Sequence, residues 1–481
     1  MHRQACAIVL TRGDGPSLEV YLTLRSMKLA FMAGFHAFPG GTMAKVDSEV
    51  RVVNATPELP AEYVSCAARE LFEECGIVVA GPLAKSRTKD DKRRALLADD
   101  TVWKKLVDDG EVVLDAKAFR PFGRWVTPPF AGRRFDARYL QLDVGDAEPA
   151  IWPGELDNGF WMPPTKALEA HDIGAVFLSF PVLETVRELV RHGDVVTTGD
   201  ILTRKALYPH PGGEMLSGLH AIASKSDTIP PSTHTNVFVL GCKELVVIDP
   251  APSDPDEQQV LIRYIEHLCS ENGATVKEVW LTHEHPDHIG AVQALRDRFG
   301  VPVAAHALTA QHIAVDRIIR DGETATMQLR GGHTAEWVAV HTPGHAQGHL
   351  CFFERRLKTL ISGDLIASVG TIIVAPPDGD MMDYMASLRK VRALNPRLLF
   401  PAHGPPVAAI AKIDAYIAHR QARERAIYEA LPSTIAEIVP KVYTDVKPDV
   451  YPLAEVNVRA HLDKLAREQR VVRDGELYSR L

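Results

Sequence analysis

The sequence lacks the patterns that mark membrane-spanning, secreted and disulfide-bonded proteins. No run of 18 apolar residues occurs, so we expect no transmembrane helix. The apolar stretch within residues 1–10 is too short for a secretion signal. The six cysteines lie far apart without a CxxC pair, which favours reduced, buried thiols over disulfides or a cysteine metal site. These absences predict a soluble protein of the cytoplasm.

Basic residues are fewer than acidic ones, 54 against 62, which gives a net charge of −8. This negative charge argues mildly against a protein that coats nucleic acid. What the sequence does contain is typical of globular domains, with 46% apolar and 24% charged residues. A length of 481 residues predicts about three domains. Residues 194–215 hold several Gly and Pro residues and few apolar runs, which predicts a linker between two halves.

Metal-binding side chains are densest in residues 282–288, which read Thr-His-Glu-His-Pro-Asp-His. This segment follows the apolar triplet of residues 279–281, which we interpret as the end of a buried strand. A loop at the end of a strand can direct several side chains at one centre. Neutral imidazoles together with a carboxylate suit zinc or a similar divalent ion.

Three further candidate ligands, His345, Asp364 and His403, each follow an apolar, strand-like run. Ligands at the ends of successive strands can converge on one edge of a sheet. At these residues the chain resembles the metallo-β-lactamase superfamily, over about residues 216–410. The resemblance implies two zinc ions and seven ligands: His283, His285 and His345 for one ion, Asp287, His288 and His403 for the other, and Asp364 bridging both.

The ligand set also implies a chemistry. Two adjacent cations lower the pKa of a water held between them and stabilise an anionic transition state. Asp287 is placed to orient that water or to accept its proton. Three other histidines lie near the cluster but match no ligand position, and we expect them to be structural: His306, His341 and His349.

A second chemical signature lies in residues 69–77, where Glu70, Glu73 and Glu74 fall at helical spacing on one face. Three acids on one stripe repel one another unless a cation neutralises them, and oxygen ligands favour Mg²⁺ or Mn²⁺. The alternative interpretation is a solvated acidic helix face.

The Phe-Pro-Gly-Gly loop at residues 38–41 favours the metal site, because this loop and helix resemble the Nudix box. The resemblance implies that the three glutamates provide the metal ligands and the base, and that Arg69 orients one of them through a salt bridge. Arg69 follows Gly41 at twice the family's spacing, and Asp47 stands where the family has Glu. We interpret residues 48–60 as an inserted loop, which leaves the role of Asp47 open.

Such an insertion is similar to that of the peroxisomal coenzyme A diphosphatase branch of the Nudix family. The similarity rests on residues 24–26, 125–128 and 133–139, with Glu155 and Trp161 further on. It implies cleavage of the diphosphate of CoA or acyl-CoA, which releases a 4′-phosphopantetheine and a 3′,5′-nucleotide.

Beyond residue 411 the pattern predicts helices at 413–431, 435–439 and 454–468, then a hairpin with an Asp-Gly turn at residues 470–478. This order predicts a small winged-helix module. Its near-equal numbers of basic and acidic side chains favour packing beside the metal site over nucleic-acid binding. A metallo-β-lactamase domain with such a tail resembles the β-lactamase-like-protein-2 hydrolases, which include single-strand endoribonucleases, and the neighbouring glyoxalase II-like branch, which cleaves thioesters.

The final tripeptide, Ser-Arg-Leu, is a variant of the peroxisomal SKL address, but it could equally finish a strand. We keep the cytoplasm as the expected location.

We therefore expect a multidomain α/β protein: a Nudix α/β/α sandwich at 1–193, a linker at 194–215, a metallo-β-lactamase αβ/βα sandwich at 216–410, and a winged-helix-like module at 411–481. The favoured function is a bifunctional hydrolase, with zinc-dependent cleavage of an ester, thioester or phosphodiester and Mg²⁺-dependent cleavage of a nucleoside-diphosphate-linked compound. Its expected partner is a small molecule such as a nucleotide or CoA derivative. The alternatives are a single-strand endoribonuclease, with RNA as the partner, and a zinc hydrolase whose Nudix half only binds a ligand. The oligomeric state is left open.

Overall fold

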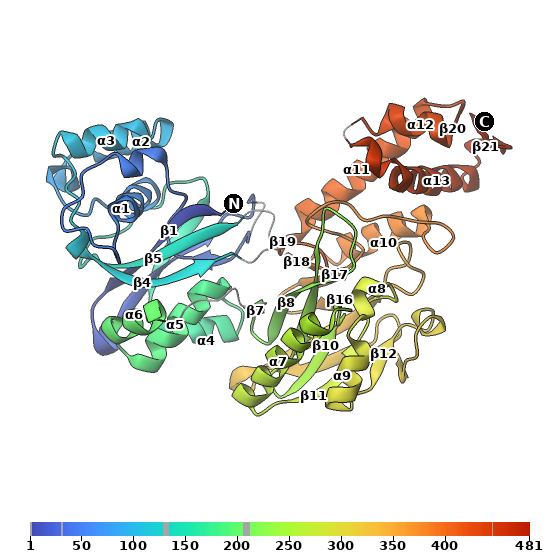
Figure 1. The fold of residues 1–481 in the computed structure, drawn as a ribbon, viewed down its shortest axis with the longest axis horizontal. Coiled ribbons are helices and arrows are strands. Elements are labelled where there is room, and N and C mark those ends of the chain that lie inside the picture. The colour runs from blue at the N-terminus through green and yellow to red at the C-terminus, as the bar shows by residue number, and fades with distance from the viewer. Residues whose placement is uncertain (1, 30–31, 128–133, 205–211, 445) are drawn as a thin grey trace. The chain divides into compact units, whose positions relative to one another are not determined.

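The computed structural model describes residues 2–29, 32–127, 134–204, 212–444 and 446–481 (Figure 1). The chain divides into two compact units, Met1–Ser217 and Gly218–Leu481. Each unit has apolar cores of its own. Among the described residues, no helix is long and apolar enough to cross a membrane.

The first unit is built on a mixed sheet with the strand order β3-β2-β1-β5-β4, and β6 also pairs with β2. Along β1, Cys6, Ile8 and Leu10 face one apolar core while Val9 faces another, because successive side chains of a strand point to opposite faces. Both faces of the sheet must therefore be covered. The strands are β1 (Arg3–Arg12), β2 (Glu19–Arg25), β3 (His36–Ala37), β4 (Phe119–Val126), β5 (Phe135–Asp143) and β6 (Leu156–Met162).

Helices cover both faces, which gives the helix–sheet–helix sandwich that the sequence predicted (Figure 1). One face carries α1 (Ala61–Cys75), with α2 (Lys89–Ala98) and α3 (Thr101–Asp108) packed beside it. The other face carries α4 (Pro164–Asp172), α5 (Phe180–His192) and α6 (Val195–Arg204).

The segment that we expected to be a linker, residues 194–215, contains the whole of α6. Leu202 of this helix is buried in the apolar core. A Cβ at Gly199 would lie 3.0 Å from the ring of Phe122, so this glycine lets α6 approach β4 closely. The glycine that we took as a loop signal is thus a packing residue. Residues 205–211 of the expected linker lie outside the described residues, and β7 (Gly212–Leu216) follows them.

The second unit contains two sheets that face each other, with helices on the outer faces, as predicted for residues 216–410. Trp280 and Phe352 stack between the sheets with ring centroids 5.1 Å apart, and Phe238 meets Phe400 edge to face at 6.3 Å. The first sheet has the order β13-β12-β11-β10-β9-β8 and the second the order β14-β15-β16-β17-β18-β19.

The strands of the first sheet are β8 (Leu219–Lys225), β9 (His234–Leu240), β10 (Glu244–Ile248), β11 (Thr275–Trp280), β12 (Val303–Ala305) and β13 (Arg317–Ile318). Those of the second sheet are β14 (Thr324–Gln328), β15 (Thr334–His341), β16 (Leu350–Glu354), β17 (Thr359–Gly363), β18 (Leu398–Pro401) and β19 (Val407–Ala408). The first sheet is covered by α7 (Pro255–Asn272) and α9 (Val292–Phe299), and the second by α10 (Met381–Ala393) and the start of α11 (Ala409–Glu429). The short α8 (Pro286–Ile289) follows β11.

The chain then forms the winged-helix module that the sequence predicted. Its elements are the end of α11, β20 (Ser433–Thr434), α12 (Ile435–Val442), α13 (Tyr451–Arg467), β21 (Val471–Asp474) and β22 (Leu477–Arg480). Thr434 caps α12 in a reciprocal bond pair with Glu437. Gly475 takes the positive φ of 58° that the hairpin turn requires. Ile438, Val458 and Leu462 belong to a core separate from those of the two sheets.

Candidate metal centres

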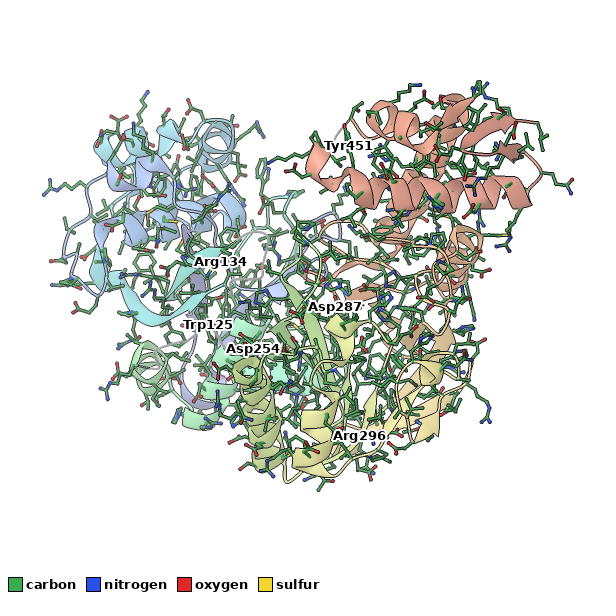
Figure 2. All side chains as sticks on the ribbon, turned by 45° about the vertical axis from the view of Figure 1, so that its right-hand side comes forward. Trp125, Arg134, Asp254, Asp287, Arg296 and Tyr451 are labelled. Carbon is green, nitrogen blue, oxygen red and sulfur yellow. The ribbon has the colours of Figure 1, made fainter. Side chains whose placement is uncertain are left out.

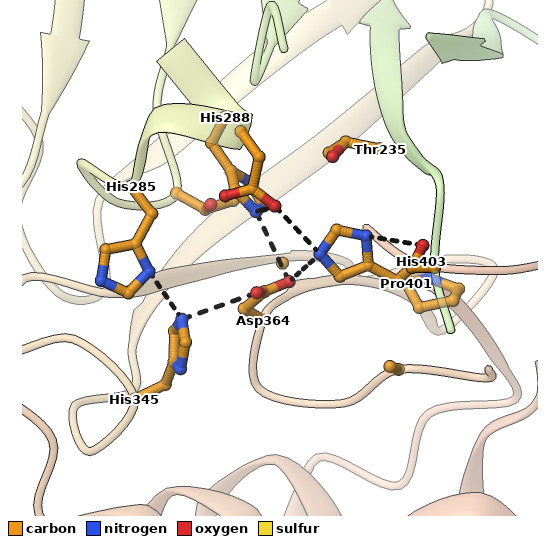
Figure 3. A network of polar contacts seen from close by, with 12 residues as sticks. Thr235, His285, His288, His345, Asp364, Pro401 and His403 are labelled. Atoms are coloured by element: carbon orange, nitrogen blue, oxygen red, sulfur yellow. Dashed lines mark hydrogen bonds and ion pairs between the residues drawn. The ribbon is translucent and has the colours of Figure 1, made fainter. Parts of the chain in front are cut away.

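Seven polar side chains from the second unit converge where its strands end. Figure 3 shows His285, His288, His345, Asp364 and His403 among them. His283 and His285 follow β11, and α8 then presents His288 beside Asp287, which is labelled in Figure 2. The remaining three follow β15, β17 and β18: His345, Asp364 and His403. These are the seven residues that the sequence singled out. Their ligand atoms form two outer groups, which a third group of His283, His288 and Asp364 joins, and within each group all atoms lie within 4.8 Å of one another.

The first group contains His283, His285 and His345. The Nδ1 atom of His285 lies 3.0 Å from Nε2 of His283 and 2.9 Å from Nε2 of His345. Zinc–nitrogen bonds of 2.0–2.1 Å at tetrahedral angles would place two nitrogens about 3.3 Å apart. The donor set and its spacing therefore fit a zinc ion.

The second group contains Asp287, His288 and His403, and Asp364 lies between the two groups. One oxygen of Asp364 is 3.5 Å from Nε2 of His345, and the other is 3.1 Å from Nε2 of His403. Nε2 of His288 and Oδ1 of Asp364 are buried and lie 3.5 Å apart, and neither makes a hydrogen bond of good geometry within the described residues. Buried polar atoms without a partner are rare in proteins, and a cation would supply the missing one.

Three of the imidazoles are oriented by a contact of Nδ1, the nitrogen that faces away from the centre. Nδ1 of His345 donates to the carbonyl of Ile373 at 2.7 Å, and Nδ1 of His403 donates to the carbonyl of His234 at 3.1 Å. Nδ1 of His283 lies 2.9 Å from the hydroxyl of Thr282. These bonds place the proton on Nδ1 and leave the Nε2 lone pair free to bind a metal.

Asp249 organises this arrangement, and the sequence did not identify it. Its carboxylate accepts hydrogen bonds from Nδ1 of His288 at 2.9 Å and from the backbone N–H and hydroxyl of Thr282, each at 2.7 Å. Asp249 follows the apolar run of β10, on the strand that pairs with β11. An aspartate directly after an apolar, strand-like run was the sequence signal that could have identified Asp249.

Burial and neighbouring charges shift the pKa values in the centre. Burial lowers the pKa of His283 well below its usual range and that of His345 to about 4, so both are neutral ligands at pH 7. Burial also disfavours charge on His288, but three carboxylates, first that of Asp364, outweigh it and hold the His288 pKa well above its usual range. Burial would raise the pKa of Asp364, yet His403 and His288 hold it well below its usual range. A cation that binds His288 therefore competes with a proton.

The three histidines that we expected to be structural lie outside the ligand groups. The rings of His306 and His341 stack with centroids 4.1 Å apart. Nε2 of His349 accepts from the backbone N–H of Asp364 at 3.0 Å, and its Nδ1 lies 2.8 Å from the hydroxyl of Thr342. His349 thus fixes the backbone that carries Asp364.

The first unit gathers a second set of candidate residues at α1. The guanidinium of Arg69 contacts Asp47 through Nε at 3.0 Å and Nη2 at 2.9 Å, Glu70 at 2.9 Å and Glu73 at 3.2 Å. Asp47 also accepts from Ser65 and the backbone of Ala44. Asp47 is therefore the buried partner of Arg69. This contact gives Asp47 a role, although the resembling family has Glu at this position. Residues 48–60 lie between Asp47 and Arg69 in the sequence, and the two side chains still meet in the fold.

The glutamates of α1 are not a solvated helix face. Glu70 is only 9% exposed, and a Cβ at Gly41 would lie 2.5 Å from its carboxyl group. Glu74 accepts from the backbone N–H of Gly40 at 2.8 Å. Burial raises the pKa of Glu70 to about 7 and that of Glu74 to about 8. Within the described parts of the chain, however, these carboxylates do not form a group as tight as those of the second unit.

The second unit matches known protein families. Residues 230–403 match the Metallo-beta-lactamase superfamily, and residues 434–480 match the Beta-lactamase associated winged helix domain. A Beta-lactamase-like protein 2 homolog of Drosophila melanogaster is 30% identical over 259 residues, which are 49% of this chain and 84% of that protein. The Atrochrysone carboxyl ACP thioesterase of Aspergillus fumigatus is 32% identical over 200 residues, 41% of this chain and 59% of that protein.

Among solved structures, a NUDIX hydrolase from Alicyclobacillus acidocaldarius is 25% identical, with a TM-score of 0.37, over 42% of this chain and 97% of that one. The family matches confirm the prediction made from the seven ligands and the winged-helix tail. The chain therefore belongs to the metallo-beta-lactamase superfamily, as a metallo-beta-lactamase-fold hydrolase with an associated winged-helix domain.

Proposed function

We propose that residues 218–481 form a dinuclear zinc hydrolase that cleaves a thioester. The convergence of seven ligand side chains on two adjacent groups carries this proposal. The thioester class is favoured because a relative at 32% identity is named as a carboxyl ACP thioesterase.

The residues around the centre support a hydrolytic role. When bound, the two cations supply an activated water and stabilise negative charge on the substrate carbonyl. Asp287 is half-buried at the centre, with its carboxylate 3.6 Å from Nε2 of His403, so it is placed to orient a water and take its proton. Asp364 and the histidines hold the reacting groups in position, and Asp249 and His349 fix those residues from behind.

We further propose that residues 1–217 hydrolyse a diphosphate linked to a nucleoside, as in CoA or acyl-CoA. The network of Arg69 with Asp47, Glu70 and Glu73 carries this second proposal, because it keeps the glutamates ordered despite the insertion. Mg²⁺ or Mn²⁺ at these carboxylates would neutralise their mutual repulsion and the charge of the diphosphate. Burial raises the pKa of Glu70 to about 7, so this carboxyl is suited to exchange a proton near neutral pH when it does not hold a cation.

One incubation tests both activities. The purified full chain, supplied with Zn²⁺ and Mg²⁺, is mixed with an acyl-CoA and the products are identified by mass spectrometry. Free CoA and a fatty acid are expected from the zinc centre, and a phosphopantetheine fragment with 3′,5′-ADP from the first unit. Asp364→Asn should abolish only the first reaction, and Glu73→Gln only the second.

Other results would contradict one proposal or both. Unchanged acyl-CoA argues against both activities on this substrate, and cleavage of single-stranded RNA would then favour the endoribonuclease alternative. Binding of acyl-CoA without diphosphate cleavage would make the first unit a ligand-binding module. Loss of both reactions in Glu73→Gln would contradict the separation of the two activities.

A further inference from the structure

The segment of residues 365–380, between β17 and α10, lies behind the first group of histidines. The carbonyl of Ile373 accepts the hydrogen bond from Nδ1 of His345 at 2.7 Å. On the same segment, Asp378 lies 3.7 Å from Nε2 of His285. One histidine of this group is therefore hydrogen-bonded to the backbone of the segment, and a second faces an acidic side chain that the segment carries.

This stretch contains neither helix nor strand that would fix its conformation. Buried backbone groups outside regular structure need side-chain partners. The backbone N–H of Val374 donates to Oδ1 of Asn457 at 3.2 Å, and Arg420 donates to the carbonyl of Ile372. The residues on both sides of Ile373 are thus held by side chains from α13 and α11.

Asn457 and Arg420 form a buried pair. Nη1 of Arg420 lies 3.4 Å from Oδ1 of Asn457, and their side chains belong to residues that are 3% and 8% exposed, respectively. Two donors, from Arg420 and Val374, face the same oxygen of Asn457, which fixes the orientation of this amide. The side-chain N–H of Asn457 donates to the carbonyl of Leu453 within α13.

Two more contacts join the same segment to the same helices. The hydroxyl of Tyr416 on α11 accepts from the N–H of Ala367 at 3.0 Å and donates to its carbonyl at 2.9 Å. Arg467 on α13 pairs with Asp380 at the other end of the segment. Helices α11 and α13 therefore contact the segment at Ala367, Ile372, Val374 and Asp380.

We infer that Asn457, held by Arg420, is a positioning residue of the metal centre and that the winged-helix module completes that centre. Asn457 fixes the backbone that orients His345, although the two residues do not touch. The inference rests on the proposed dinuclear zinc centre. Partners that orient metal ligands typically change metal affinity by 10- to 100-fold. Because His345 belongs to only one of the two groups, the effect should fall on one zinc ion.

The test compares the full-length wild type with three variants. Asn457→Leu keeps the approximate volume but removes the acceptor, and Asn457→Asp retains an acceptor oxygen for Val374 and Arg420. Leu462→Ala is the matched control, because Leu462 is a buried residue of the same helix that packs in the module's own core. Zinc affinities are measured by competition with a chromophoric chelator. The visible spectrum of the Co²⁺-substituted protein reports the ligand geometry.

In Asn457→Leu we expect one of the two zinc affinities to fall about 10- to 100-fold, with a changed Co²⁺ spectrum. Asn457→Asp should restore both, and Leu462→Ala should lower the melting temperature while both affinities stay at the wild-type value. Wild-type affinities in Asn457→Leu would overturn the inference, as would an equal loss at both sites or the same loss in Leu462→Ala. A wild-type chain that binds no zinc would instead overturn the proposed centre, and this inference with it.

Discussion

The histidines of the metal centre depend on ordinary hydrogen bonds for their orientation. Each bond is made by the ring nitrogen that faces away from the cations, so its partner need not resemble a metal ligand. Asp249 and the carbonyl of Ile373 act in this way, and His349 instead fixes the backbone that carries Asp364. Changes at such residues should therefore alter metal binding without removing a ligand.

Replacement of Asp249 tests directly whether such a hydrogen-bond partner affects metal binding. In Asp249→Ala, His288 and Thr282 lose their acceptor, and three buried donors are left without partners. We expect zinc affinity in the group containing His288 to fall about 10- to 100-fold, and the free energy of unfolding to fall by about 1–3 kcal/mol or more. Zinc titration and urea unfolding measure the two effects.

The control for this variant is Asp254→Ala, which removes the exposed N-cap of α7. It should cost about 1 kcal/mol of stability and leave both zinc ions bound. Full zinc affinity in Asp249→Ala would contradict the role of Asp249.

A substitution at Gly41, which lies against Glu70, gives a second prediction for a single residue. In Gly41→Ala the new methyl group would lie 2.5 Å from the Glu70 carboxyl, so Glu70 must move. We expect diphosphatase activity to fall at least about tenfold, with a loss of stability of about 1–3 kcal/mol from overpacking. Thioester hydrolysis by the same preparation serves as the internal control. Undiminished diphosphatase activity would show that the position of Glu70 is not critical.

At the scale of elements, helices α11 and α13 are joined by an ionic cluster around Glu424. Its carboxylate lies 2.8 Å from Lys464, 3.6 Å from Nδ1 of His461 and 3.5 Å from Arg470. Burial alone would raise the pKa of Glu424, but the nearby imidazole of His461 and the ammonium group of Lys464 lower it from 4.5 to about 2. A lowered carboxyl pKa stabilises the fold at a pH above the unfolded value, and this stability is lost as the pH falls from about 4.5 to about 2.

We therefore predict that Glu424→Gln lowers the free energy of unfolding by about 2 kcal/mol at pH 7. The difference from the wild type should shrink as the pH is lowered towards 3. Denaturant unfolding of the metal-free full chain at both pH values measures it. A difference that is equal at the two values would contradict a pH-dependent contribution from this carboxylate.

Several elements were predictable because their signals are local. Helix α1 follows from helical spacing and ends at Gly76, which has the left-handed conformation of a C-cap. Helix α6 was missed because Gly199 is a common loop residue, and only its closeness to Phe122 shows why glycine stands there. The Ser-Arg ending lies in β22, where Arg480 donates to the carbonyl of Tyr428, so the tripeptide also serves the fold. Localisation stays a prediction.

For the whole molecule, metal removal should affect the two units unequally. Zinc at about 1,000 times its dissociation constant stabilises the unit that binds it by about 4 kcal/mol. For a unit of this size that corresponds to a melting temperature higher by about 10 °C. We expect a zinc chelator to lower the calorimetric transition of residues 218–481 and to leave that of residues 1–217 nearly unchanged.

Asp364→Asn supplies the control for this experiment. Its transition should lie near that of the chelated wild type and respond little to the chelator. Equal shifts of both transitions in the wild type would contradict a zinc site confined to the second unit.

The sequence alone predicts the seven candidate ligands, the glutamates of α1 and the order of the domains. It could do so because metal ligands must be particular residue types, placed where strands end, and because helix and strand periodicities are local. The partners that hold those residues are seen only in the folded chain. Asp47 meets Arg69 across an insertion, Asp249 meets His288 from a neighbouring strand, and Asn457 meets Val374 from 83 residues away. An aspartate or asparagine is unremarkable in a sequence, and its role comes from the donor that folding brings to it.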